Sequence, residues 1–223
     1  MPTSDELYEK LNCELSQIQS EVSSLKVNQH VFREVQGMIR KNPNLRRPST
    51  FYGWMGNLYA AAMTAAVRRL VDQRKDVISF VRFLDQVKTH PSCVSREAYK
   101  KRFTNPNLPL KYMDKDYDRL VGVGILHPEP KKIAIEIQAL KSIAEPLKQF
   151  VDERIAHTSK QQAKTLPKFD DLDRAIDKLE ALTLRYLHLF RGAAYPSGLL
   201  PTWQYDWKEI FHYPWIADQQ REH

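Results

Sequence analysis

The chain has 223 residues, and its 34 Lys and Arg against 27 Asp and Glu give a formal net charge of +7. Hydrophobic residues make up 42%, which is enough for the core of one domain or two small ones and excludes a disordered or fibrous protein. The 7 Gly and 13 Pro argue against glycine-rich phosphate loops and against an all-β protein with frequent tight turns. The composition therefore favours a helical protein.

The cysteines and the apolar segments indicate the cellular compartment in which the protein is expected. Cys13 and Cys93 are far apart and form no CxxC pair, so a cysteine metal cluster is excluded and a disulfide scaffold is not expected. The acidic, polar N-terminus lacks the basic start and apolar run of a signal peptide. The longest weakly charged stretch, residues 51–67, falls short of the ~20 apolar residues that span a bilayer. We expect a cytoplasmic protein with no membrane contact, metal or cofactor.

A long helix is expected first. Ser4, followed by two acids, is a helix-start signal. An apolar stripe from Leu7 to Leu25 recurs every three or four residues, and the helix is expected to continue with a bend to about Arg40. Two prolines and two asparagines in residues 41–48 end it. Further helical segments are expected over 50–70 (capped by Thr50), 76–90, 95–103, 114–121, 131–144 and 170–191, the last ended by Gly192.

One alternative stays open at Pro146, because proline is tolerated in the first turn of a helix and disrupts its interior. Residues 146–157 are either a separate helix or the second half of a kinked one. No segment alternates with period two, so the chain is predicted to be an all-α bundle of five or more helices. We divide it into an N-terminal helical arm (1–45), a helical bundle (46–195) and a C-terminal tail (196–223).

The segment over residues 195–215, here called the strap, has a different character. It contains Trp203, Trp207 and Trp215, three of the four tryptophans, together with three prolines. It cannot be a regular helix throughout. Its aromatic side chains are expected to fill grooves between the helices. The alternative is a platform on which nucleobases stack, or a partner-binding tail.

His157 stands apart among the histidines. It shares one helix face with Glu153 and Arg154, near an expected helix end whose negative dipole favours a protonated imidazole. A His beside an Arg can act as an acid–base and phosphate-contact pair. The alternative is a capping His beside an ordinary Glu–Arg pair. His188, between two leucines of a strong helix, is expected to pack rather than to bind a metal.

The residues around His157 carry a family resemblance. Val-Asp-Glu-Arg-Ile-Ala-His-Thr (151–158) resembles the RNKxxAH signature of HEPN domains, in particular that of the abortive-infection U-type HEPN-like family of bacteria. The resemblance implies an α-helical bundle that is commonly dimeric. Together with the patterns above, it predicts an all-α HEPN-like helical bundle with a long N-terminal helix and an irregular aromatic C-terminal strap. Further similar segments, in the same order as in the family, are 54–72, 79–84, 165–182 and 206–215.

The resemblance also implies chemistry. In active members, an Arg and a His separated by four to six residues cleave RNA without a metal; the His moves protons and the Arg stabilises the phosphate charge. His157 matches the family His, and Asp152 matches the polar position that follows the family Arg. Val151 stands at the Arg position itself, and two residues separate Arg154 from His157. His157, Arg154 and Asp152 are therefore the candidate catalytic residues of a metal-independent endoribonuclease, with weak or no activity expected.

Three functional hypotheses follow as expectations. The first is an RNA-directed role in phage defence or in a toxin–antitoxin-like pair, to which basic clusters at 40–41, 46–47 and 100–102 add a hint of polyanion binding. Those clusters can equally be a solvated basic surface. The second is a catalytically inert dimeric protein-interaction module, and a purely structural helical adaptor is a third reading. The expected partners are a second copy, bound through the stripe from Leu7 to Leu25, RNA, and a protein encoded nearby.

Overall fold

The computed structural model describes residues 3–103, 110–150, 168–213 and 215. Within these ranges the chain forms α-helices and short 3-10 helices and no strand, which confirms the prediction of an all-α protein. The elements are α1 (Ser4–Lys41), α2 (Thr50–Leu70), α3 (Phe80–Thr89), η1 (Pro91–Val94), α4 (Arg96–Phe103), α5 (Leu110–Leu120), α6 (Pro130–Phe150), α7 (Phe169–Arg191) and η3 (Glu209–His212).

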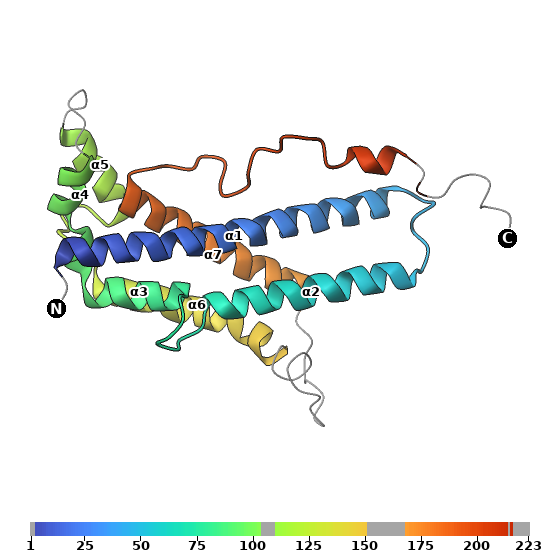
Figure 1. Cartoon of the computed structure of the whole chain (residues 1–223), viewed down its shortest axis with the longest axis horizontal. Coiled ribbons are helices and arrows are strands. Elements are labelled where there is room, and N and C mark those ends of the chain that lie inside the picture. The colour runs from blue at the N-terminus through green and yellow to red at the C-terminus, as the bar shows by residue number, and fades with distance from the viewer. Residues whose placement is uncertain (1–2, 104–109, 151–167, 214, 216–223) are drawn as a thin grey trace.

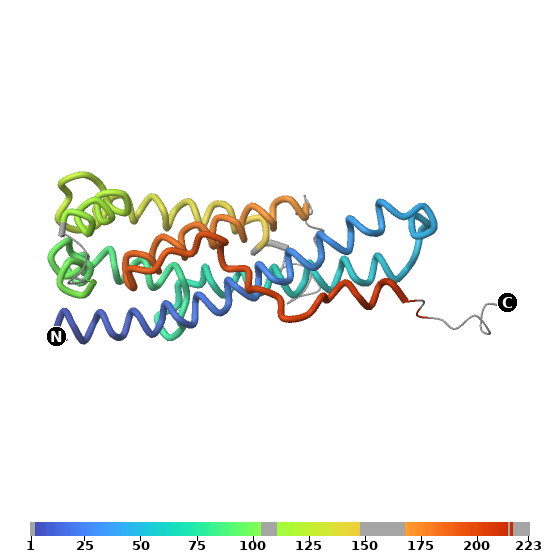
Figure 2. The backbone as a smooth tube through the Cα atoms, turned by 90° about the horizontal axis from the view of Figure 1, so that it is seen from above, coloured from blue at the N-terminus to red at the C-terminus, as the bar shows by residue number. Residues whose placement is uncertain are grey.

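The helices form an elongated bundle (Figure 1). α1 runs along most of its length, and α2 and α3 follow one another beside α1 in the opposite direction. α6 and α7 complete the bundle, with α7 packed against α1 and α6 against α3 and α2. The short helices α4 and α5 lie at the end where the chain begins, as both views show (Figures 1 and 2).

The helix starts follow local hydrogen-bonding chemistry, one residue earlier than predicted in two cases. Thr3, not Ser4, caps α1: its hydroxyl accepts from the backbone N–H of Glu6 (3.2 Å), while the Glu6 carboxylate accepts from the Thr3 N–H (2.8 Å). This reciprocal pair needs an acid three residues after the cap, a condition that Thr3 meets. Ser49, not Thr50, caps α2 through the Phe51 N–H.

The apolar stripe of α1 is buried inside the chain's own bundle. Leu11, Leu15 and Val22 are completely inaccessible, and they share one core with residues of α2, α3, α6 and α7. The stripe is therefore not available to a second copy, and its proposed use as a dimer surface is wrong. Dimerisation itself stays a prediction, as does the division of the chain at residues 45 and 195.

Three segment boundaries differ from the predicted ones. α3 begins after Ser79 and not at Asp76, because the buried Ser79 hydroxyl accepts from the backbone N–H of Arg82 (3.1 Å) and caps the helix there. α5 already begins at Leu110, before the predicted residue 114. α6 continues through Pro146 to Phe150 as one helix, which settles the alternative at that proline over the described residues.

As predicted, α7 ends at Gly192, whose φ of +62° is in the left-handed region, and the strap follows from residue 195. It then runs back along α1 toward the far end of the bundle (Figure 1). Leu199 is buried, and its N–H donates to the Glu180 carboxylate (2.9 Å). The expectation that the aromatic side chains of the strap fill grooves between the helices is wrong for most of them, since Trp203 is 39% exposed and Trp215 is 69% exposed.

Candidate functional site

The predicted site residues Asp152, Arg154 and His157, together with Val151, lie in the segment 151–167, outside the described residues. This segment follows directly on α6. The described residues nearest to it along the chain are the C-terminal turn of α6 on one side and Lys168, just before α7, on the other.

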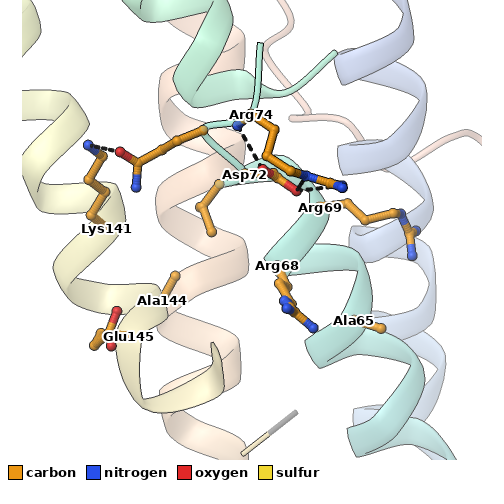
Figure 3. Close-up of a pocket in the computed structure, with 10 residues that line it drawn as sticks. Ala65, Arg68, Arg69, Asp72, Arg74, Lys141, Ala144 and Glu145 are labelled. Carbon is orange, nitrogen blue, oxygen red and sulfur yellow. Dashed lines mark hydrogen bonds and ion pairs between the residues drawn. The ribbon is translucent and has the colours of Figure 1, made fainter. Parts of the chain in front are cut away.

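A cleft of about 680 Å³ opens between α6 and the C-terminal end of α2 (Figure 3). Four cationic side chains and two acids stand around it, so its lining carries an excess of positive charge. The residues that line it are Ala65, Arg68, Arg69, Val71, Asp72, Gln73, Arg74, Lys141, Ala144 and Glu145.

The α2 side of the cleft is organised around Asp72. Its carboxylate accepts from the backbone N–H of Arg74 (2.9 Å) and pairs with the Arg74 guanidinium (3.0 Å). The backbone hydrogen bond from Arg74, with the guanidinium adding to it, lowers the pKa of Asp72 against the opposing effect of its burial. One turn earlier, Arg69 pairs with Glu21 of α1 (2.5 Å) but keeps 63% of its side chain exposed. Both guanidinium groups therefore face solvent while held by a carboxylate.

Lys141 stands on the α6 side. Its ammonium donates to the side-chain oxygen of Gln73 (2.7 Å), an uncharged partner in the connection that follows α2. The dashed line at Lys141 in Figure 3 marks this contact, which joins α6 to that connection. Glu145, one turn further along α6, is exposed. The cleft thus presents cations from two helices around one open space. Such an arrangement can bind a phosphate or another small anion through charge-assisted hydrogen bonds.

A second polar cluster ties α7 to α4 and α5. The Asp116 carboxylate accepts from His188 Nε2 (2.7 Å) and from the Tyr99 hydroxyl, and it pairs with Arg119. His188 is a satisfied packing residue, as expected. Sequence reasoning had no signal for its partner, because no spacing rule links a residue of α5 to one of α7 that is 72 positions away.

Among the described residues, no group of three or more His, Cys, Asp and Glu side chains could hold a metal ion. Cys13 is exposed, Cys93 is buried, and both are free thiols. None of the described helices combines the length and the apolar character needed to cross a bilayer.

Comparison with known proteins places the chain in a family. Residues 5–211 match the family model of the HEPN proteins described as AbiU2, a stretch that extends from the first helix to the strap. Comparison with curated proteins and with solved structures gave no match. The resemblance seen around His157 is thus part of a match over nearly the whole chain, and this protein belongs to the AbiU2 family of HEPN proteins.

Proposed function

We propose that this AbiU2-family protein acts in abortive infection by engaging RNA at the cleft between α2 and α6. The observation that carries the proposal is the gathering of Arg69, Arg74 and Lys141 around one open space. The helix that supplies Lys141 leads directly into the segment with the candidate residues Arg154 and His157. Cations in this place would bind the phosphates of an RNA strand whose scissile bond lies near that segment.

The chemistry would divide between the two parts of the site. His157 would move the proton of a ribose 2′-hydroxyl or of the leaving oxygen, and Arg154 would stabilise the charge that develops on the phosphate. Asp152 would orient or polarise its neighbours from the position after the family Arg. Because Val151 replaces that Arg, we expect the protein to bind RNA but to cleave it weakly or not at all.

Charge reversal in the cleft tests the binding step. In a titration of the full chain with single-stranded RNA, Arg74→Glu and Lys141→Glu should weaken binding and flatten its salt dependence, by about 0.7 in the log–log slope for each phosphate that is no longer neutralised. Lys131→Glu is the matched control, because Lys131 is an exposed cation on the same helix outside the cleft. Equal binding by all three variants would remove the cleft from the function.

An exposed face of α2 favours the alternative, a catalytically inert dimeric module. Phe51, Trp54 and Leu58 recur at helical spacing and are 50%, 56% and 52% exposed. Apolar side chains that gather on one helix face and are rimmed by polar residues are typical of protein-interaction surfaces. A second copy of the chain or a protein encoded nearby would cover this face. Light scattering on the wild type and on Leu58→Glu tests self-association: the wild type should be a dimer and the variant a folded monomer.

A further inference from the structure

An unbroken series of aromatic rings runs from α1 along the strap. We call His30, Trp203, Trp207, Phe211 and Trp215 the aromatic ladder. The ring centroids of His30 and Trp203 are 6.0 Å apart, those of Trp203 and Trp207 6.2 Å, those of Trp207 and Phe211 6.2 Å, and those of Phe211 and Trp215 5.7 Å. The four strap residues follow one another at intervals of four positions, through a segment that is mostly irregular.

The ladder is held in place but not covered. Lys208 pairs with Glu34 of α1 (2.5 Å), and its ammonium lies 5.5 Å from the Trp207 ring centre. Trp215 donates its indole N–H to the backbone oxygen of Ile210 (3.0 Å). Nevertheless Phe211 is 40% exposed and Trp215 is 69% exposed. Rings that are fixed in position and open to solvent can receive a ligand without a large cost of ordering.

Basic side chains lie at the end of the bundle where the ladder ends. On α1, Lys41 lies eleven positions after His30, three helical turns along, and therefore on the same face. Arg40, Lys41, Arg46 and Arg47 are all exposed where α1 ends and the connection to α2 begins. η3 lies at that same end of the molecule (Figures 1 and 2).

Fewer acidic than basic side chains lie near the ladder. Glu34 is neutralised by Lys208, and the Asp206 carboxylate accepts from the Lys208 backbone N–H (2.9 Å). Glu209 is exposed at the start of η3. Between Glu34 and Lys41, a Cβ added at Gly37 would meet nothing within 4 Å, so α1 is uncovered at that position.

We infer that the aromatic ladder is a stacking platform for a single-stranded segment of RNA. Unpaired bases would stack on the rings, and the cations at the end of α1 would neutralise the phosphates of the same strand. This inference rests on the proposed function and adds to it the form of the RNA. In Figure 1 the strap runs above α1, whereas α2 and α6, whose residues line the cleft, lie below it, so the platform is a second contact and not part of the cleft.

The arrangement favours single strands over other partners. The bases of a duplex are stacked on each other and cannot reach a protein ring, whereas a single strand exposes a flat face at every base. An apolar protein surface would gain from the rings but not from the exposed Arg and Lys side chains at 40, 41, 46 and 47, whereas a single strand would gain from both. The combination of rings and cations is the one that single-stranded nucleic acid requires.

Tryptophan fluorescence reports on the proposed contact directly, because three of the four tryptophans belong to the ladder. The full chain is titrated with oligoadenylate of about 12 nucleotides, within the usual site size of stacking platforms, and with a duplex of the same length. The single strand should quench the fluorescence and the duplex should not. Trp215→Leu and Phe211→Leu, which keep an apolar side chain, should each weaken binding by about 5- to 150-fold.

Tyr112→Leu is the control, since Tyr112 is an exposed ring beside a lysine on α5, at the opposite end of the bundle. It should bind as the wild type does. If the wild type binds the single strand and both ladder variants bind it equally well, the inference is overturned while the proposed function stands. If the wild type binds no RNA of either form, the proposed function fails and the inference fails with it.

Discussion

His188 Nε2 lies 2.7 Å from Oδ2 of Asp116, and this contact joins α7 to α5. The same carboxylate accepts from Tyr99 of α4 and pairs with Arg119. Burial of Asp116 would by itself raise its pKa, but the hydrogen bond from Tyr99 and the interaction with His188 outweigh burial, and the pKa is lowered. The end of the bundle formed by α4 and α5 is therefore held to α7 by an ionised carboxylate.

Asp116→Asn should lower the free energy of unfolding by about 1–3 kcal/mol at neutral pH, because an amide oxygen cannot serve all three donors of the carboxylate. A carboxylate whose pKa is lowered by folding contributes stability above its unfolded pKa, near 3.8, and loses it as the pH falls further. The difference between variant and wild type should thus shrink below about pH 4. Urea unfolding at several pH values measures it, with Asp76→Asn, an exposed position, as control.

Arg96→Lys should destabilise the same end of the bundle by about 1–3 kcal/mol. The Arg96 guanidinium pairs with Asp118 and with Asp114 (3.2 Å) and also donates to the backbone oxygen of Ile125 (3.1 Å). A single ammonium cannot make these contacts at once. Arg174→Lys, at a surface pair where 67% of the arginine side chain is exposed, should change stability by less than about 1 kcal/mol. Equal losses of stability in the two variants would mean that the Arg96 contacts do not stabilise the fold.

The sequence was sufficient for the helices and insufficient for their mutual contacts. The apolar periodicity predicted the buried face of α1, including Leu15 and Val22, since a 3.6-residue repeat of apolar residues is a local property. It could not tell whether that face packs within the chain or on another chain. Nor could it place Lys141 opposite Arg74, because the cleft depends on how α6 crosses the end of α2. The exposure of the strap aromatics was not predicted, because aromatic residues are usually buried and the path of the strap over the helices depends on the tertiary fold.

Leu15→Ala should cost about 2–5 kcal/mol in unfolding free energy without changing the oligomeric state, because Leu15 is fully buried in the bundle core. Leu58→Ala, on the exposed face of α2, should change the stability of the isolated chain by no more than about 0.5 kcal/mol. Denaturant unfolding and light scattering together separate the two sites. A Leu15 variant that dissociates an otherwise stable assembly would restore the α1 stripe as an interface.

Two glycines should respond in opposite directions to alanine. Gly37 lies within α1, and an added Cβ would meet nothing within 4 Å, so Gly37→Ala should stabilise the protein by about 0.5–1 kcal/mol. Gly192 ends α7 at a φ of +62°, and an added Cβ would stand 3.0 Å from the Phe103 ring. Gly192→Ala should therefore destabilise the protein by about 1 kcal/mol or more. Thermal unfolding measures both variants, and we expect the Tm to rise in Gly37→Ala and to fall in Gly192→Ala.

Catalysis by the family mechanism depends on a cation at the right distance from His157. We expect weak or absent cleavage of RNA by the wild type, because Val151 stands at the family Arg position. Any activity present should fall by about 10²–10⁴-fold in His157→Ala, the usual effect of losing a general acid or base. Arg154→Ala should cost nearly as much, since Arg154 is the arginine nearest to His157 along the chain.

The converse variant is Val151→Arg, which places an Arg with five residues between it and His157, within the family spacing. It should raise cleavage above that of the wild type, and the increase should vanish in Val151→Arg combined with His157→Ala. Single-turnover cleavage of a labelled RNA measures all of these variants on one scale, because it reports the chemical step without product release. Activity that persists in His157→Ala would place the reaction elsewhere and leave His157 as a helix-capping residue. Robust cleavage by the wild type would instead mean that Arg154 stabilises the phosphate charge from a different position in the segment.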